Sequence, residues 1–384
     1  MSLVETKNAP ILRFNEFIGD WTNKNLGDLG DIVNGLTYSP ENICDDGVLV
    51  LRSSNVHNGQ LKFDDNVYVS SQDFNPVKEN DILICVRNGS KRLIGKNCLI
   101  DKKSEGLAFG AFMTVYRSNL NKFIFQLFSH QSYFKTVHKN LGATINSINN
   151  SDLKKFNFFF PEIDEQQKIA EFLSSVEKKI QLLEKKKEQL ELYKKGVMQK
   201  IFSQEIRFKD ENENSFPDWE EKKLEDICYK TSSNLSASDC ETDSGEYPVY
   251  GASGIYTFIS SFDFKEDYIA IVKDGSGVGN LIYCVSNSSV IGTMDVLRTR
   301  LNNDLKFLYY FLQTVSFKKF KVGSSIPHIY FRDYRSLKKL TPNNNEQKKI
   351  ANFLSAIDKK IETTSTQIDK TKEFKKGLLQ QMFV

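Results

Sequence analysis

The stretch PEIDEQQKIAEFLSSVEKKI at residues 161–180 returns as PNNNEQKKIANFLSAIDKKI at residues 342–361. At this offset the match runs without a gap over residues 161–202 and 342–383, and 17 of the 42 positions are identical. Both copies end on the pattern KKG–x–x–Q–x–x–F. A repeat of this length predicts that one structural unit occurs twice in the chain.

Each copy is predicted to form one long helix. A proline precedes each copy, and Asp164 or Asn345 can cap the helix. Apolar residues recur every seven positions, with polar residues mixed into the middle of each row, as is typical of a two-helix coiled coil. A helix that begins at Asp164 and ends with the repeat would be roughly 58 Å long. Gly196 and Gly377 are expected to interrupt the helices near their ends.

A short arm and a tryptophan precede each globular segment. The arm LRF at residues 12–14 comes before Trp21, and the arm IRF at residues 206–208 comes before Trp219. Because the second arm leads from the first helix into the second globular segment, the N-terminal arm should dock in the same way near Phe383. This predicts antiparallel helices, adjacent termini and a pseudo-two-fold molecule.

The segments between the helices are predicted to be two α+β domains. The apolar strand and Gly-Ser loop at residues 81–90 resemble those at residues 267–276, and the last third of each segment has a helical pattern. The expected organisation is an N-terminal arm at 1–20, a globular domain at 21–160, a helix at 161–203, a linker arm at 204–218, a globular domain at 219–341 and a helix at 342–384.

Length and composition exclude several classes of protein. The 384 residues exceed the roughly 250–300 that one hydrophobic core supports. The 46 aromatic residues exclude a disordered or collagen-like chain. There is no long apolar run for a membrane span and no secretory signal in the first 20 residues, so a cytoplasmic location is expected. The six cysteines form no CxxC pair and are predicted to be reduced thiols.

The net charge of +3 conceals a pattern that occurs in both domains. Residues 21–82 have 4 basic and 10 acidic residues, whereas residues 83–160 have 12 basic and 3 acidic. Residues 219–304 have 7 basic and 14 acidic residues, whereas residues 305–341 have 8 basic and 1 acidic. One such change could be an ordinary Lys-rich surface, but its recurrence favours two cationic faces that bind DNA phosphates.

Three motifs together resemble a known family. Each domain opens with D-W–x₄–L, each helix carries P–x₃–E-Q–x₂–I-A–x₂–L, and the second domain contains YPVYGASGI at residues 247–255. The chain resembles, over nearly its whole length, the specificity subunit (HsdS) of type I restriction–modification systems of prokaryotes.

The resemblance implies a function in phage defence. Each target recognition domain would read one half of a bipartite DNA sequence, and the helices would set the gap between the halves and bind two modification (methyltransferase) subunits. Those subunits would hold S-adenosylmethionine and methylate adenine, and restriction subunits that use ATP and magnesium could join. No cofactor is expected on this chain. Because the two domains differ outside the matched segments, the two half-sites should differ.

Candidate DNA contacts fall into two groups. Phosphate contacts are expected from residues around the matched glycine loops, namely Lys135, His138, Lys139, Thr144, Lys318, Lys319, Lys321, Ser324 and Ser325. Base readers are expected in polar loops, namely Arg52, Ser54, Asn55, His57, Arg87, Asn88, Ser90, Lys91 and Arg92 in the first domain and Tyr250, Ser253, Lys273, Asp274, Ser276, His328, Tyr330 and Arg332 in the second. An ordinary structural role stays open for each, and Arg52 could form a salt bridge.

The helices are expected to present a surface to the modification subunits. The candidate residues are Ile169, Phe172, Leu173, Val176 and Ile180 in the first helix and Ile350, Phe353, Leu354, Ile357 and Ile361 in the second.

Catalytic motifs are mostly absent. There is no GxxxxGK[ST] loop and no NPPY-like tetrapeptide. The glycines at residues 275–279 resemble a nucleotide-binding loop but lack the following helix and acidic residue, and the four scattered histidines do not suggest zinc. A non-enzymatic DNA-reading subunit is favoured. A self-contained enzyme and a scaffold that does not touch DNA are the alternatives.

Overall fold

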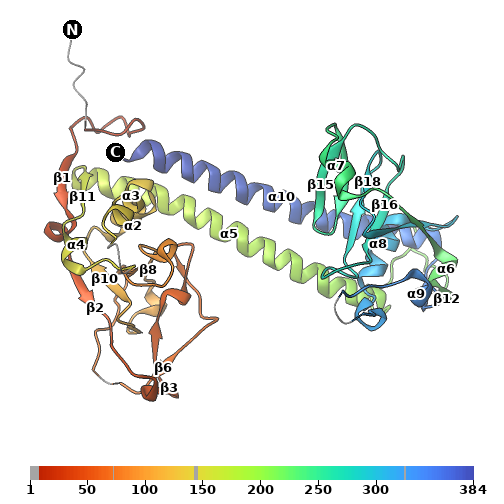
Figure 1. Ribbon diagram of the computed structural model, residues 1–384, viewed down its shortest axis with the longest axis horizontal. Coiled ribbons are helices and arrows are strands. Elements are labelled where there is room, and N and C mark those ends of the chain that lie inside the picture. Colours follow the sequence, from red (N-terminus) through yellow and green to blue (C-terminus); the bar gives the residue numbers. More distant parts are fainter. Residues whose placement is uncertain (1–7, 72, 142–145, 324–325) are drawn as a thin grey trace, which may run out of the picture. The chain divides into compact units, whose positions relative to one another are not determined.

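The computed structural model describes residues 8–71, 73–141, 146–323 and 326–384. The chain forms two compact units. Unit 1 consists of the residues up to Glu184 together with Thr366–Val384, and unit 2 is Lys185–Ser365. Each unit contains one α+β domain, a segment of helix α5 (Ile163–Phe202) and a segment of helix α10 (Asn344–Met382) (Figure 1).

Both long helices are continuous, so the predicted interruptions at Gly196 and Gly377 are wrong. Helix α5 has 40 residues and helix α10 has 39. A glycine inside a helix costs only about 1 kcal/mol relative to alanine. The packing of the neighbouring turns outweighs this cost, since Ile201 and Leu378 are buried close to the two glycines.

The two helix segments of each unit run antiparallel. In unit 1, Lys375 Nζ lies 2.5 Å from Glu177 Oε1, and Lys372 Nζ lies 2.6 Å from Glu184 Oε1. The two helix segments of unit 1 therefore run in opposite directions. In unit 2 the corresponding contacts join Lys194 to Asp358 (2.6 Å) and Lys187 to Ser365 (3.2 Å).

The domain of unit 1 is built on a four-stranded antiparallel sheet. Its strand order is β2 (Asp31–Asn34), β10 (Met113–Arg117), β7 (Ile82–Cys85) and β8 (Asn97–Leu99). Smaller sheets are formed by β6 (Tyr68–Val69), β3 (Ile43–Leu51) and β9 (Ala108–Phe109), by β1 (Thr22–Asn25) and β11 (Asn157–Phe160), and by β4 (Val56–His57) and β5 (Gln60–Leu61). The helices are α1 (Leu26–Leu29), α2 (Asn121–Ser129), α3 (Gln131–Lys139) and α4 (Asn150–Lys154).

The domain of unit 2 repeats this plan. Its main sheet has the order β13 (Cys228–Ser232), β19 (Met294–Thr299), β16 (Tyr268–Val272) and β17 (Leu281–Cys284). Smaller sheets are formed by β15 (Gly254–Ile259), β14 (Tyr247–Gly251) and β18 (Ser289–Val290), and by β12 (Glu220–Lys223) and β20 (Lys338–Thr341). The helices are α6 (Leu224–Ile227), α7 (Ala237–Glu241), α8 (Leu305–Gln313) and α9 (Phe331–Tyr334). The predicted α+β class is confirmed in both units.

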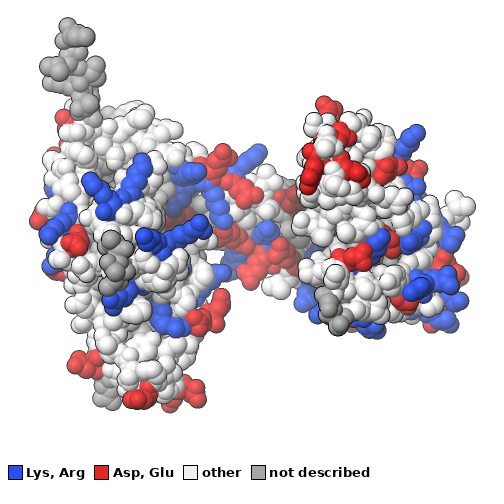
Figure 2. Space-filling view, in the orientation of Figure 1, with Lys and Arg blue, Asp and Glu red and all other residues white. Residues whose placement is uncertain are grey.

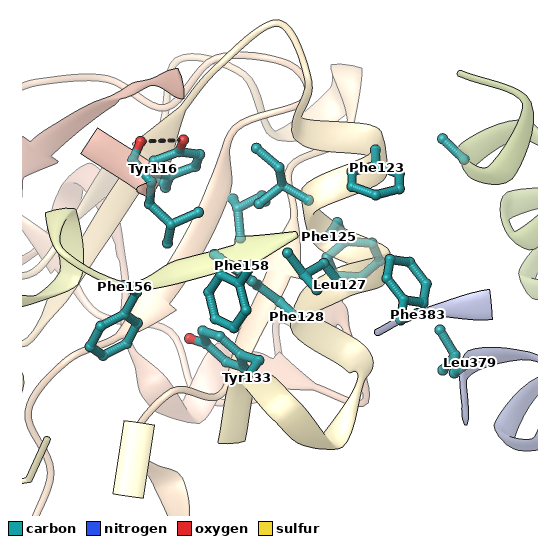
Figure 3. Packing of buried hydrophobic residues seen from close by; sticks show 14 of the residues in the cluster. Tyr116, Phe123, Phe125, Leu127, Phe128, Tyr133, Phe156, Phe158, Leu379 and Phe383 are labelled. Atoms are coloured by element: carbon teal, nitrogen blue, oxygen red, sulfur yellow. Dashed lines mark hydrogen bonds between the residues drawn. The ribbon is translucent and has the colours of Figure 1, made fainter. Parts of the chain in front are cut away.

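Aromatic side chains join the arm, the domain and the helix ends in unit 1. The N–H of Leu12 donates to the carbonyl of Gln381 (2.8 Å), so the N-terminal arm docks where the repeat predicted. The Phe383 ring lies 6.2 Å from the Trp21 ring and 5.4 Å from the Phe123 ring, centroid to centroid. Figure 3 shows Phe383 and Leu379 beside the side chains of α2.

Unit 2 has the same junction between its own segments. Phe202, at the end of α5, lies 6.4 Å from Trp219 and 5.9 Å from Phe307, centroid to centroid. These three residues correspond in the repeat to Phe383, Trp21 and Phe123. The end of one long helix therefore completes the core of each domain.

All six cysteines are unpaired, and five of them are buried. Burial raises the pKa of the Cys98 and Cys228 thiols to about 12, because the thiolate loses its hydration in an apolar site. These two thiols are therefore unreactive at neutral pH.

Candidate nucleic-acid interface

In unit 1, three segments that are distant in the sequence meet at the end of strand β7. The N–H of Arg87 donates to the carbonyl of Phe112 (3.1 Å), in the turn that leads into β10. The N–H of Ile148 donates to the carbonyl of Val86 (2.9 Å), and the N–H of Asn88 to the carbonyl of Asn146 (3.3 Å). The backbone thus holds the loop after β7 between two other segments.

Polar side chains attach a fourth segment. Asn88 Nδ2 donates to Ser53 Oγ (3.0 Å), and Lys96 Nζ donates to the carbonyl of Ser53 (3.1 Å). The predicted loop that contains Arg52 and His57 therefore lies beside the predicted loop that contains Arg87. Lys96 is a further cation of this site that sequence reasoning missed, although it lies only four residues beyond Arg92.

Unit 2 makes the same backbone connections. The N–H of Lys273 donates to the carbonyl of Thr293 (3.1 Å), and the N–H of Ile329 to the carbonyl of Lys273 (3.0 Å). The N–H of Gly275 donates to the carbonyl of Pro327 (2.9 Å). The loop after β16 is thus held next to the segment that carries His328.

The turn of the β14–β15 hairpin completes the cluster in unit 2. A Cβ atom placed on Gly277 would lie 3.8 Å from Ala252 Cβ, so this turn is adjacent to the loop after β16. The neighbouring residue Ser253 is exposed there. On the other side, the His328 and Tyr330 rings lie 5.3 Å apart, and the Arg332 guanidinium lies 4.6 Å from the centroid of the Tyr330 ring.

The charge of the unit 1 site favours an anionic ligand. Residues 87–98, 106–113, 131–141 and 146–151 contain no aspartate or glutamate. Figure 2 shows Lys and Arg side chains gathered on one face of unit 1, with Asp and Glu concentrated at one end. Such a surface suits the phosphates of DNA.

The unit 2 site is less basic and has a buried acid. Asp295 is 4 % exposed, and its Oδ1 lies 3.7 Å from Lys273 Nζ and 3.6 Å from Lys230 Nζ. Unit 1 has Thr114 at the equivalent position, where its hydroxyl donates to the carbonyl of Val33 (2.9 Å). Lys273 is therefore already paired, and the two sites differ chemically.

Most of the predicted contacts that the structure describes are accessible. The exposed residues are His57, Arg87, Ser90, Lys91, Arg92, Lys135, His138, Lys139, Ser253, Ser276, Lys318, Lys319, Lys321, Tyr330 and Arg332, and the half-buried ones are Arg52, Ser54, Asn88, Lys273, Asp274 and His328. Arg52 forms a salt bridge, which was the structural role considered for it from the sequence: its guanidinium lies 2.9 Å from Asp65 Oδ2. Thr144, Ser324 and Ser325 lie outside the described residues.

Two predicted base readers are not available to DNA. Asn55 is fully buried, and its Nδ2 donates to the carbonyls of Lys62 (3.0 Å) and Asp65 (3.3 Å), so its amide holds the loop closed. Tyr250 is 7 % exposed and packs in an apolar cluster, where its hydroxyl accepts from the N–H of Val285 (3.4 Å). Burial raises the pKa of Tyr250. Both residues have a structural role.

The predicted partner-binding residues of the helices are also corrected. Seven of them are buried in the cores of their own units, namely Ile169, Leu173, Val176, Ile180, Ile350, Leu354 and Ile357. The other three are half-buried. The Phe172 ring contacts the Phe14 ring of the arm (5.8 Å), the Phe353 ring contacts the Phe208 ring (5.5 Å), and Ile361 packs against the core of unit 2. These side chains stabilise the units and do not form a free surface.

Membrane and metal sites are absent from the part of the chain that the structure describes. None of its helices is long and apolar enough to cross a membrane. No group of three or more His, Cys, Asp or Glu side chains could hold a metal ion within those same ranges.

Comparison with known proteins agrees with the duplicated plan. Residues 18–192 and 217–373 each match the family described as type I restriction modification DNA specificity domain. The chain is 24% identical over 421 residues to the type I restriction enzyme MjaX specificity subunit assigned to Methanocaldococcus jannaschii, covering 99% of this chain and 96% of that protein. It is 26% identical over 267 residues to the StySPI specificity subunit of Salmonella potsdam, covering 64% of this chain and 54% of that protein.

A solved structure shares the fold. The type I restriction–modification S subunit from M. genitalium superposes with a TM-score of 0.69 at 20% identity, over 98% of this chain and 99% of that one. Two family matches that together span most of the chain, and the repeated site they contain, establish that this chain belongs to the family of type I restriction–modification specificity subunits (HsdS).

Proposed function

We propose that the chain is the DNA-reading subunit of a type I restriction–modification complex and is itself non-catalytic. Each unit reads one half of a bipartite, asymmetric DNA target, and α5 and α10 act as an antiparallel coiled-coil spacer related by a pseudo-two-fold axis. The target recognition domains correspond to residues 21–160 and 219–341. The observation that carries the proposal is the convergence of the same loops at the same strand end in both units, among exposed cations.

The partners follow from this function. Two modification subunits hold S-adenosylmethionine and methylate adenine in each half-site, and restriction subunits that use ATP and magnesium join them. Because the buried residues of the helices serve the cores, the modification subunits dock on other parts of the helices. The helices carry five apolar side chains that are more than half exposed, and these support this docking. They are Ile163, Leu182 and Phe374 in unit 1 and Leu192 and Tyr193 in unit 2.

The difference between the two sites supports an asymmetric target. Unit 1 presents Arg87 with no acid in its site segments, whereas unit 2 presents a lysine that is paired with Asp295. Arg87 can donate two parallel hydrogen bonds to guanine, whereas the ammonium group of Lys273 is already engaged by a carboxylate. The two half-sites therefore have different sequences.

The test is base-resolved mapping of methylated adenines in cells that express the chain with its modification subunits. We expect one bipartite, asymmetric motif. The variant Arg87→Ala should relax the motif in one half only, because it removes a base contact from one unit. Unchanged methylation would refute the role of Arg87, and a motif without two halves would refute the proposed function.

Two further measurements separate the alternatives. The pure chain, incubated with DNA and S-adenosylmethionine, should transfer no methyl group, and transfer without a partner would identify an enzyme. The assembled complex should bind DNA more weakly as salt rises, with a log–log slope near −0.9 per phosphate contact. A complex that does not bind DNA would identify a scaffold.

A further inference from the structure

Phe112 is the most exposed phenylalanine in the described structure, with 58% of its surface accessible. Its exposure does not come from a loose backbone. The carbonyl of Phe112 accepts from the N–H groups of Val86 (3.0 Å) and Arg87 (3.1 Å), and the N–H of Ala111 donates to the carbonyl of Leu36 (2.9 Å). The next residue, Met113, is buried in the core. The fold therefore exposes a large apolar ring to solvent on a turn whose backbone is fixed by hydrogen bonds.

The surroundings of this ring are cationic. The guanidinium carbon of Arg87 lies 5.5 Å from the ring centroid, within the range of a cation–π contact. The exposed cations Lys91 and Arg92 follow in the same loop, and the turn at residues 110–112 contains no acid. An aromatic ring with an arginine stacked on it, set among cations, is the combination that stacks on nucleic-acid bases.

Unit 2 shows that the fold does not need an aromatic residue here. At the equivalent position, the carbonyl of Thr293 accepts from the N–H of Lys273 (3.1 Å), so the backbone contact is the same. Thr293 is exposed as well. The ring of Phe112 is therefore an addition in unit 1 and not a structural requirement of the turn.

We propose that Phe112 inserts as a wedge against a base step in the half-site read by unit 1, with Arg87 held against the same step. This rests on the proposed function and adds a specificity-determining residue to it. Apolar wedges of this kind partly unstack a step and kink the duplex. Flexible pyrimidine–purine steps deform most easily, so the first half-site is read partly through its deformability. The half-site of unit 2 is read without such a wedge.

The test uses the complete complex and a duplex that carries the mapped target. Each adenine except the methylated ones, which a methyltransferase itself flips out of the stack, is replaced in turn by 2-aminopurine, whose fluorescence rises when it is unstacked. The half-site of unit 1 is the one that Arg87→Ala relaxes. The variants are Phe112→Ala, Phe112→Trp as a rescue, and Phe63→Ala as a matched control, since Phe63 is also exposed (45%) in unit 1 but lies beside Asp64.

We expect the wild type, Phe112→Trp and Phe63→Ala to raise the fluorescence at one step of the first half-site. Phe112→Ala should lose this rise and bind the target roughly 5- to 150-fold more weakly, as expected for one stacked base. Wild-type affinity with an unchanged fluorescence rise in Phe112→Ala would overturn the inference. So would a wild-type complex that binds its target with no fluorescence rise in the first half-site. A wild-type complex that binds no DNA would instead overturn the proposed function on which the inference rests.

Discussion

The arm of each unit is held by a buried glutamate, and the glutamate of unit 2 accepts one more hydrogen bond than the glutamate of unit 1. In unit 2, Glu346 is fully buried and accepts from Arg207 Nε and Nη2 (both 2.9 Å) and from Trp219 Nε1 (3.0 Å). In unit 1, Glu165 is 1% exposed and accepts from Arg13 Nε (2.7 Å) and Nη2 (2.6 Å).

The perturbation is Glu346→Ala, compared with the matched variant Glu165→Ala. Removing one partner of a buried ion pair costs about 3–5 kcal/mol of unfolding free energy, because the other charge is left unpaired. This cost applies to both variants. Glu346→Ala also leaves the buried indole N–H of Trp219 without an acceptor, which adds about 1–3 kcal/mol. The indole N–H of Trp21 already has no partner, so Glu165→Ala carries no such addition.

The two tryptophans, the only ones in the chain, make the units separately measurable. Urea unfolding of unit 2 is followed by Trp219 fluorescence in a Trp21→Phe background, and unfolding of unit 1 by Trp21 fluorescence in a Trp219→Phe background. We expect unit 2 to lose about 1–3 kcal/mol more through Glu346→Ala than unit 1 loses through Glu165→Ala. Equal losses, or a larger loss in unit 1, would refute the assignment of the extra cost to the Trp219 hydrogen bond.

Three further perturbations test other contacts. Phe383→Ala should destabilise unit 1 by about 3–5 kcal/mol in the Trp21 fluorescence assay, because the ring is buried against Trp21; a loss below about 1 kcal/mol would contradict this docking. Burial, and then the charge of Lys135, lowers the pKa of His130, so the unfolded state takes up the proton first. Unit 1 should therefore lose stability as the pH falls below about 6.5, and a variant His130→Gln with the same pH profile would be contrary evidence. Phe374→Asp should weaken binding of the modification subunit in pull-down without changing the thermal midpoint, whereas unchanged capture would argue against this docking surface.

The internal comparison of the two copies predicted the parts of the fold that depend on local pattern. The equivalence of Trp21 and Trp219, the docking of the N-terminal arm near Phe383 and the strand before Arg87 were all predicted, because each has a counterpart in the other copy. The sequence predicted the residues of the site less accurately than it predicted the fold. Asn55 and Tyr250 are residue types that can hydrogen-bond to bases, so they were predicted to do so. In the folded domain, a neighbouring segment covers each of them.

Phe112 is the opposite case, because it is exposed at the site but was not predicted to belong to it. An aromatic residue next to a buried strand is usually part of a core, and nothing in its local pattern indicates exposure. Its position follows from contacts with Val86 and Arg87, some 25 residues earlier in the chain. Lys96 was missed because the residue that it reaches, Ser53, lies 43 positions away.

Duplication, the two long helices, the α+β class and the change from acidic to basic halves are all properties of the linear sequence, since they arise from periodicity, composition and self-similarity. The division of each helix between the two units is a property of the tertiary structure. Antiparallel pairing brings Glu177 to Lys375 across 198 positions, and apolar residues such as Ile169 are then buried by a domain instead of facing a partner. Burial is decided by contacts between segments that are distant in the sequence, and a local pattern does not contain those contacts.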